Sequence, residues 1–347
     1  MKQLLFSICL LLSSAIFSQS SIETINEINL DEIPNNQIKK YWLTMIDNTF
    51  SQPISIPVII LKGKEEGPVL GLIASIHGNE LNGIKVIQES IKDINVEELK
   101  GMVIAIPGIN ALSIGQDRRR FVDEEDLNRN FPGKANGNRS QQYVWQINQK
   151  ILPKLDYLID MHTASFGRIN SLYVRGEMGD EKISNMALLQ DADIVLSNKG
   201  VPSTGDNIAA TRTMRAEAML KGIPTITVEY GNPQVYQEDM VTRGVVGVKN
   251  VMKWLNMQSF STPDLKPAIL CKRSYWIYVD QGGLLDVPVE LNQIIEKGDV
   301  IGVLRNPFGD VLKEYVAPEK GIVIGKSSNP VNIDGGRIIH LGILEDK

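Results

Sequence analysis

The sequence is poor in the residues that build disulfide frameworks and cysteine-ligated metal centres. Two cysteines in 347 residues are too few for either. It also lacks an excess of positive charge, because 36 Lys and Arg stand against 41 Asp and Glu, a net charge of -5. No basic field of the kind that attracts nucleic acid is present, and we therefore expect no nucleic-acid partner.

Long apolar runs are also missing, apart from one at the N-terminus. Residues 4–17 are mostly apolar, follow the basic Lys2 and end in small and polar residues at 18–20. The run is shorter than the about 20 residues that a membrane-spanning helix needs. We interpret residues 1–18 as a secretory signal peptide, which predicts an exported protein, periplasmic or extracellular, with no membrane span after cleavage. The mature chain keeps one cysteine, Cys271, and so no internal disulfide.

Between residues 55 and 258, apolar strand-like runs alternate with amphipathic helical patterns. We predict strands at 57–62, 69–76, 102–107, 157–162, 171–174, 194–197 and 224–230. Several are apolar throughout, as in strands buried on both faces. Apolar residues at helical spacing recur in 80–94, 140–152, 181–191, 213–221 and 238–256. This alternation predicts an α/β domain with a central sheet covered by helices on both faces.

The pattern changes after residue 258. Residues 259–269 are polar and turn-rich, which is typical of a linker. Residues 270–347 show short strand-like pieces between Gly, Pro, Asn and Asp, without helical spacing. We therefore predict a small C-terminal all-β domain of barrel or sandwich type, and an N-terminal extension at 19–54 that leads into the main sheet.

Two of the predicted strands end in residues that can bind a metal ion. His77 closes one strand and is followed by Glu80, and His162 closes another. Two histidines and a carboxylate, with one position open for water, are the protein ligands of catalytic zinc sites, where the pKa of bound water falls to about 7. We expect His77, Glu80 and His162 to hold one divalent cation, zinc. Asp160 lies on the same strand face as His162 and is a candidate to orient the ligands.

A carboxylate and a clamp complete the candidate site. Glu229 ends the apolar strand at 224–230, and one glutamate can take a proton from water and pass it to a leaving amine. Asn128 and Arg129 offer an amide donor and a planar guanidinium fork, which pair well with a carboxylate. We expect Glu229 to act as general acid and base, and Asn128 with Arg129 to grip a substrate carboxylate.

Three further arginines precede this clamp. One of Arg118, Arg119 and Arg120 is a candidate to polarise the scissile carbonyl, and a solvated loop is the alternative. The sequence leaves open which arginine serves. We predict that Arg168 lies at the surface. His340 alternates with apolar neighbours along its strand, and we interpret it as structural and not as a metal ligand.

At these residues the sequence resembles the succinylglutamate desuccinylase/aspartoacylase family, deacylases related to zinc carboxypeptidases. The matching motifs are H-G-N-E at 77–80, D-L-N-R-N-F-P-G at 126–133, D-M-H-T at 160–163 and V-E-Y-G at 228–231, in the family's order. The resemblance implies a zinc-carboxypeptidase-like three-layer α/β/α fold with a mixed sheet. It also implies the same zinc ligands, the same acid/base and the same clamp, with the carbonyl-polarising arginine just upstream of D-L-N-R.

The C-terminal segment resembles the barrel-sandwich domain that is attached to many members. It shows no clear equivalent of the aspartoacylase substrate-binding residues, so the resemblance carries over no substrate. We predict a zinc-dependent hydrolase that cleaves the amide bond of an N-acyl amino acid or a similar small carboxylate-bearing molecule. The alternatives are a zinc carboxypeptidase acting on peptides or cell-wall fragments, and a non-catalytic ligand-binding protein that keeps the fold. Whether the chain forms a homo-oligomer stays open.

Overall fold

The computed structural model describes residues 22–200 and 212–345. The predicted signal peptide, residues 1–18, lies outside this part of the chain. Among the described residues, no helix is both long enough and apolar enough to cross a bilayer.

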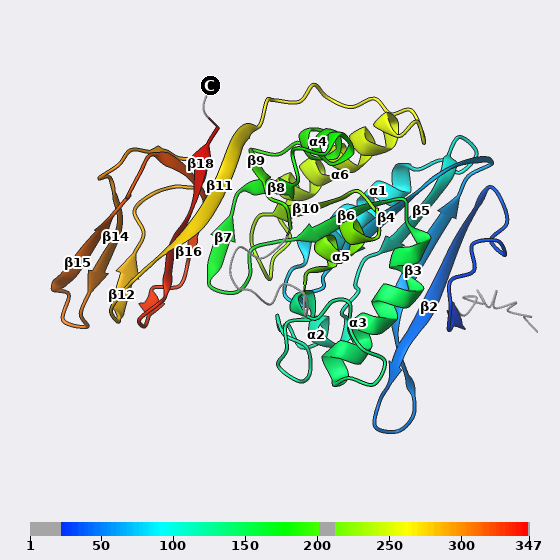
Figure 1. The fold of residues 1–347 in the computed structure, drawn as a ribbon, viewed down its shortest axis with the longest axis horizontal. Helices are drawn as coiled ribbons and strands as arrows, with labels where there is room; N and C mark the ends of the chain where they lie inside the picture. The colour runs from blue at the N-terminus through cyan, green and yellow to red at the C-terminus, as the bar shows by residue number, and fades with distance from the viewer. Residues whose placement is uncertain (1–21, 201–211, 346–347) are drawn as a thin grey trace, which may run out of the picture.

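The larger of the two sheets in the described residues has fourteen strands (Figure 1). From edge to edge its order is β1 (Glu23–Ile25), β2 (Gln37–Asp47), β3 (Pro53–Lys62), β5 (Lys100–Ile106), β4 (Glu65–Ala74), β6 (Tyr157–His162), β10 (Thr225–Tyr230), β8 (Leu172–Gly176), β9 (Ile194–Ser197), β11 (Ile269–Tyr278), β18 (Arg337–Leu344), β16 (Gly321–Ser327) and β13 (Ile294–Ile295), with β7 (Arg168–Asn170) paired to β16. Its centre is parallel across β5, β4, β6 and β10, and β8 runs antiparallel to β10.

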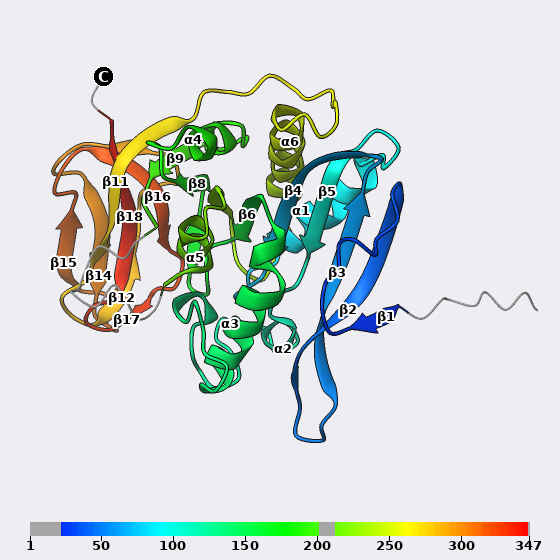
Figure 2. The ribbon, with the colours of Figure 1, turned by 45° about the vertical axis from the view of Figure 1, so that its right-hand side comes forward.

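Helices cover both faces of the central strands. They are α1 (Asn82–Ser90), α2 (Ala111–Ile114), α3 (Arg139–Lys150), α4 (Glu181–Leu188), α5 (Met214–Leu220) and α6 (Glu238–Trp254), with short 3-10 turns η1 (Ile91–Asp93), η2 (Leu127–Arg129) and η3 (Leu152–Lys154). Val86 of α1, Ile183 of α4 and Val248 of α6 pack into one core. Val144 of α3 and Met214 of α5 pack into a second core on the other face (Figure 2).

The C-terminal strands continue the main sheet. Residues 258–268 carry no helix or strand, and β11 then pairs in parallel with β9. A smaller sheet lies outside it, in the order β15 (Val311–Val316), β14 (Val300–Arg305), β12 (Gly283–Asp286) and β17 (Val331–Asn332). This region has its own core, and a further cluster that includes Tyr173, Ile194 and the buried free Cys271 joins it to the α/β part.

The predicted fold class is confirmed: a mixed sheet lies between two helical layers, and a strand-rich region with a small separate sheet follows. The predicted strands 157–162 and 194–197 have the bounds of β6 and β9. The sequence patterns missed β2, which lies inside the predicted N-terminal extension. Many side chains of β2 are exposed or half-buried, so its apolar pattern is weak.

Candidate active site

The central strands deliver polar side chains to one face of the sheet. In β10, Ile226 and Val228 enter the core beneath α1 and α6, so that Glu229 faces the opposite side. The same alternation in β6 places Asp160 and His162 on that side, because Ile159 and Met161 belong to the same core as the apolar residues of β10. Glu229 lies directly beside His162 in the parallel register. The two strand ends therefore bring together the imidazole that we expected to bind a cation and the carboxylate that we expected to transfer a proton.

The loop after β4 delivers the other two candidate ligands. Ser75 has a left-handed backbone, with φ at 60°, and its hydroxyl donates to the Glu80 carbonyl at 2.6 Å. Gly78 is required for a close approach, since a Cβ at this position would lie 2.2 Å from the Ser113 carbonyl carbon. This tight turn directs both His77 and Glu80 toward the end of β6.

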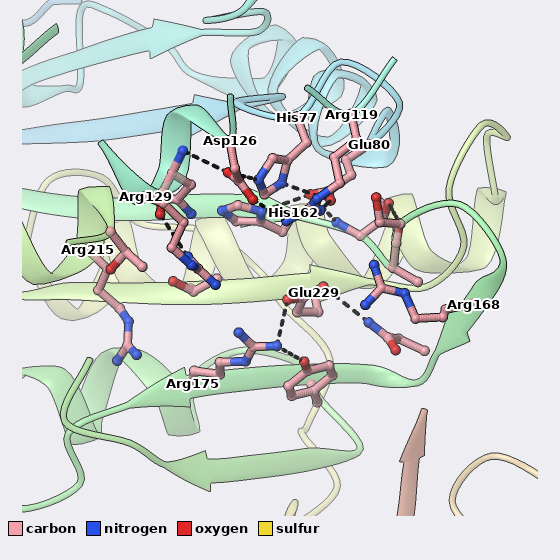
Figure 3. A pocket seen from close by; sticks show the side chains of 18 of the residues that line it. His77, Glu80, Arg119, Asp126, Arg129, His162, Arg168, Arg175, Arg215 and Glu229 are labelled. Carbon is pink, nitrogen blue, oxygen red and sulfur yellow. Dashed lines mark hydrogen bonds and ion pairs between the residues drawn. The ribbon is translucent and has the colours of Figure 1, made fainter. Parts of the chain in front are cut away.

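His77, Glu80 and His162 converge on one point (Figure 3). Their potential ligand atoms lie within 4.8 Å of one another, and all three residues are buried. His77 Nδ1 lies 2.9 Å from Glu80 Oε1, and His162 Nδ1 lies 2.8 Å from Glu80 Oε2. The structure thus brings together the three residues that we expected to bind the cation.

Each histidine also lies close to a second carboxylate. His77 Nε2 lies 2.9 Å from Asp126 Oδ1, and His162 Nε2 lies 3.1 Å from Asp160 Oδ1. Such carboxylate–histidine pairs fix the ring orientation and raise the basicity of metal-binding histidines. Asp126 also caps η2, because its Oδ1 accepts a hydrogen bond from the Asn128 amide at 3.0 Å.

The donor atoms fit a cation. When His77 donates Nε2–H to Asp126, Nδ1 of the neutral ring carries a lone pair that faces the Glu80 carboxylate, and this buried nitrogen has no hydrogen-bond partner. The Nδ1 lone pair and the carboxylate oxygen are both electron-rich, so they can face each other at this distance only with a positive charge between them. Burial raises the pKa of Glu80, but the imidazoles of His77 and His162, when protonated, outweigh it and hold that pKa well below its usual range. When the rings are neutral, a bound cation would supply the positive charge that keeps the carboxylate ionised, as a metal ligand must be.

Of the three candidate arginines, Arg119 reaches this cluster. Its Nη1 lies 2.8 Å from Glu80 Oε1 and its Nη2 lies 2.9 Å from Asp126 Oδ2. Arg118 instead pairs with the Glu124 carboxylate at the surface. Arg120 lines the cavity but donates to the Glu124 backbone carbonyl at 2.6 Å. The structure therefore favours Arg119 as the guanidinium beside the three candidate metal ligands.

Glu229 is held by two residues that the motifs did not include. Its Oε1 lies 3.1 Å from Arg175 Nη2, and its Oε2 accepts a hydrogen bond from Asn170 Nδ2 at 3.2 Å. Arg175 also contacts the Tyr173 hydroxyl. Both carboxylate oxygens of Glu229 are thus positioned before any substrate arrives.

The predicted clamp lies in the same cavity. Asn128 Oδ1 accepts a hydrogen bond from the Met214 amide at 2.7 Å, so its Nδ2 remains available as a donor. Arg129 donates from Nη1 to the Asn128 carbonyl at 2.7 Å and makes no ion pair among the described residues. Burial and the charge of Arg119 lower the pKa of Arg129, against the opposing effect of the Asp126 charge. An anionic ligand would relieve both effects.

These groups open onto one cavity of about 580 Å³. The prediction that Arg168 lies at the surface is wrong, because Arg168 is half-buried and lines this cavity. Sequence reasoning also missed the lining residues Asn170, Arg175, Trp276 and Arg337. Arg175 directly follows the predicted strand at 171–174. This position at a strand end is the sequence feature that could have identified it as a site residue. Trp276 and Arg337 reach the cavity only through long-range strand pairing.

Comparisons with known proteins agree with this architecture. The sequence model for the succinylglutamate desuccinylase/aspartoacylase catalytic domain matches residues 66–255. The chain is 31% identical over 111 residues to N-alpha-acetyl-L-2,4-diaminobutyric acid deacetylase of Halomonas elongata, a match that covers 32% of each protein. The chain thus matches about a third of the length of that curated relative.

Solved structures resemble it over most of its length. The product-bound ectoine utilization protein EutE (DoeB) of Ruegeria pomeroyi has a TM-score of 0.80 at 17% identity and covers 90% of this chain and 98% of its own. A succinylglutamate desuccinylase/aspartoacylase of Rhodobacter sphaeroides has a TM-score of 0.80 at 20% identity, over 93% and 100% of the two chains. Because the family model covers more than half of the sequence, the chain belongs to the succinylglutamate desuccinylase/aspartoacylase family.

Proposed function

We propose that this protein is a zinc-dependent deacylase that hydrolyses the amide bond of an N-acyl amino acid or a similar small carboxylate-bearing molecule. The observation that carries the proposal is the meeting of His77, Glu80 and His162 in one cavity with Glu229 and Arg129. Family membership and the curated relative, whose name describes a deacetylase acting on an acylated amino acid, support the same reaction class.

Zinc is the cofactor in this proposal. Two imidazoles and one carboxylate form a donor set that suits zinc, and they leave room for a water molecule. When bound, zinc supplies a Lewis acid and a water of lowered pKa. His77, Glu80 and His162 are the residues that would hold it, while Asp126 and Asp160 keep the imidazoles oriented.

Glu229 moves the proton. Arg175 and Asn170 hold its carboxylate beside His162, where it accepts a proton from the attacking water and passes it to the nitrogen of the departing amine. Arg119 stands beside Glu80 and offers its guanidinium to the negative charge that develops on the carbonyl oxygen. Arg129 and Asn128 Nδ2 bind the carboxylate of the amino-acid part and so position the scissile bond.

The shape of the cavity supports a small substrate over a long peptide. Trp276 of β11 and Arg337 at the start of β18 line the same cavity as the metal-binding residues, so the C-terminal strands wall off one side. A non-catalytic ligand-binding protein would have no use for Glu229 held beside a metal site. We further propose that the protein acts outside the cytoplasm, on the basis of residues 1–18.

The test combines metal analysis with hydrolysis. Protein purified without added chelator is expected to carry about one zinc per chain and to release free amino acid from a panel of N-acyl amino acids. Dialysis against a chelator should abolish the release, and added zinc should restore it. Matched peptides with free C-termini are the second arm. Hydrolysis of the peptides alone would overturn the deacylase assignment in favour of a carboxypeptidase, and no hydrolysis in either arm would contradict an enzyme.

A further inference from the structure

Glu229 lies at a position from which a carboxylate can bind a metal ion. It is the neighbour of His162 in the parallel register of β10 and β6, and both side chains face the same side of the sheet. Carboxylate oxygens are ordinary zinc ligands. Residue type alone therefore does not decide which of the two glutamates, Glu80 or Glu229, binds a cation and which one stays free.

This choice matters for the proposed reaction. Structural zinc sites are closed by four protein ligands, whereas catalytic sites have three and keep one position for water. If His77, Glu80 and His162 hold the cation, a bound Glu229 would be the fourth protein ligand. The site would then lose its position for water and its acid/base at the same time.

The structure sets Glu229 apart from the candidate ligands. Among the described residues, the three candidate ligands form a group whose ligand atoms lie within 4.8 Å of one another, and Glu229 is not part of this group. Glu80 contacts Arg119 but still presents one oxygen to each imidazole, at 2.9 Å from His77 and 2.8 Å from His162. The two glutamates therefore have different partners in the same cavity.

The partners of Glu229 lie on its other side. Its Oε1 lies 3.1 Å from Arg175 Nη2, and its Oε2 accepts the hydrogen bond from Asn170 at 3.2 Å. Arg175 belongs to β8, which pairs with β10 on the edge opposite to β6, so Arg175 and His162 stand on opposite sides of Glu229 (Figure 3). Charge-assisted hydrogen bonds are among the strong ones. They direct both oxygens of Glu229 away from the ligand cluster.

Arg175 is itself fixed by its own strand. Its Nη2 contacts the Tyr173 hydroxyl, and its Cζ lies 5.2 Å from the centre of the Tyr173 ring. Tyr173 lies opposite Glu229 in the antiparallel register, so the guanidinium reaches along β8 over this ring to meet the carboxylate. The ring is buried and lies edge-on to His340 at 6.0 Å. The guanidinium is therefore in place before substrate or metal binds.

We propose that Arg175 is a positioning residue that keeps Glu229 from binding the metal ion. Its guanidinium acts through this carboxylate and not on the substrate. The carboxylate is then available to move a proton, and one coordination position of the cation is left for water. The inference deepens the proposed deacylase function and rests on it, because hydrolysis needs both that position and that base.

The first measurement is zinc affinity, by competition with a chromophoric chelator. Loss of a residue that orients metal ligands typically lowers metal affinity, by roughly tenfold to a hundredfold. Arg175→Met should instead raise zinc affinity by at least about tenfold, because the released carboxylate becomes a fourth ligand. Its kcat should fall by about two orders of magnitude on the N-acyl amino acids that the wild-type protein hydrolyses.

A double-mutant cycle with Glu229→Gln separates coordination from charge. Loss of a positive charge near a cation also favours metal binding, but to the same extent whether residue 229 is Glu or Gln. If the carboxylate is the new ligand, R175M raises zinc affinity at least about tenfold in the wild-type background and no more than about twofold in E229Q. Equal gains in the two backgrounds, no gain, or a loss of affinity would overturn the inference.

Cobalt reports on the coordination itself. The visible absorption of protein-bound Co²⁺ depends on the number and the type of its ligands. The spectrum of cobalt-loaded R175M should differ from that of the wild type, and the spectrum of R175M/E229Q should return to the wild-type form. Identical spectra for the wild type and R175M would contradict the inference.

Further variants control for charge and for folding. Arg120→Met removes another guanidinium from the same cavity but releases no carboxylate, because Arg120 donates to a backbone carbonyl. Its zinc affinity should change by less than about twofold. Arg175→Lys keeps a positive charge beside Glu229 and should restore wild-type zinc affinity with part of the turnover.

Thermal midpoints show whether each variant folds. If R175M does not fold, Tyr173→Phe takes its place, because it removes only the hydroxyl that contacts Arg175 and keeps the ring. It should raise zinc affinity by about threefold, as expected for one lost hydrogen bond. Unchanged affinity in Y173F would then overturn the inference.

The metal measurements do not depend on turnover, so they separate this inference from the proposed function. A tighter zinc site in R175M that requires Glu229, in a protein that hydrolyses no N-acyl amino acid, would support the positioning role and contradict the reaction. Zinc-dependent hydrolysis by the wild type, with unchanged zinc affinity in R175M, would support the reaction and overturn the positioning role. A wild-type protein that binds no zinc would overturn both.

Discussion

The two walls of the cavity differ in how they are built. One wall consists of the ends of β4, β6 and β10, where His77, Glu80, His162 and Glu229 lie. Its carboxylates and imidazoles are engaged with one another or with an arginine, and most are buried. The other wall consists of residues from β7, β11 and β18, and its arginines have no carboxylate partner among the described residues.

Under the proposed function, this difference separates chemistry from recognition. A group that moves protons or binds a metal must be held in one geometry before substrate arrives, and partners on the protein provide that order. A group that recognises an anion gains most when the ligand is its first counter-charge. We therefore expect changes in the strand-end wall to affect turnover or metal content. Changes in the wall from β7, β11 and β18 should affect substrate choice, except where that wall touches Glu229.

The largest effect is expected from Glu229→Gln. An amide cannot accept the proton from water, so kcat should fall by roughly two to four orders of magnitude. Zinc content should stay unchanged, because Glu229 is not one of the three converging ligands. Steady-state kinetics and metal analysis measure the two effects. The matched control is Glu319→Gln, which changes a surface carboxylate paired with Arg273. Wild-type turnover in E229Q would refute the acid/base role.

His77→Ala should remove metal as well as activity. Only Glu80 and His162 remain as ligands, and Asp126 loses the imidazole that it orients. We expect most of the zinc to be lost on dialysis, as measured by mass spectrometry of the dialysed protein. His340→Gln is the control, because it removes a buried imidazole outside the metal-binding cluster. Full zinc occupancy in H77A would exclude His77 from the ligand set.

A smaller effect tests the point where the two walls meet. Asn170 lies on β7, opposite Gly325 of β16, and its side chain donates to Glu229. Asn170→Ala should lower kcat by about tenfold with little change in KM, since a hydrogen bond to a charged group is lost. Gly325→Ala should act similarly, because the added Cβ would lie 2.3 Å from Asn170 Oδ1.

The control for this pair is Gly282→Ala. Its added Cβ would meet only the Asn332 carbonyl oxygen at 3.5 Å and an Ile333 carbon at 3.8 Å, which are ordinary contacts. Unchanged kcat in both N170A and G325A would show that Glu229 needs no support from the C-terminal strands. The cavity walls would then be independent of each other.

The strand-end wall was predictable because its residues lie close to strong local signals. Apolar runs mark β6 and β10, and strand alternation decides which side Asp160 and His162 face. The choice of Arg119 among three neighbouring arginines was not predictable. It depends on how the loop between α2 and η2 folds back onto Glu80, which no periodic pattern encodes.

The other wall was not predictable for a different reason. Arg168 and Trp276 are more than sixty positions apart in the sequence, and so are Trp276 and Arg337. They meet because β7 pairs with β16 while β11 pairs with β18. A single sequence does not show which residues of two distant strands pair with each other. The predicted surface position of Arg168 failed for this reason, since the strand that covers it comes from the C-terminal region.

The last expected effect concerns the stability of the second wall, and not turnover or metal content. Burial, with the charges of Arg175, Arg168 and Arg337, lowers the pKa of His340 to about 3. The unfolded chain binds a proton at this histidine below its ordinary pKa of about 6.5, whereas the folded protein does not until about pH 3. Stability from this group is therefore complete above pH 6.5 and falls by up to about 1.4 kcal/mol per pH unit below it.

His340→Gln removes the titrating group and is expected to flatten part of this dependence. Its Nε2 partner, the Ser274 hydroxyl, can still hydrogen-bond to an amide. The measurement is the thermal midpoint of each protein at pH 7.5, 6.5, 5.5 and 4.5. Because the substitution also changes packing against Trp276, only the slope with pH is compared, not the midpoint itself. Parallel slopes in the two proteins would mean that an imidazolium is tolerated beside the arginines, and the wall would then be less cationic than its residues imply.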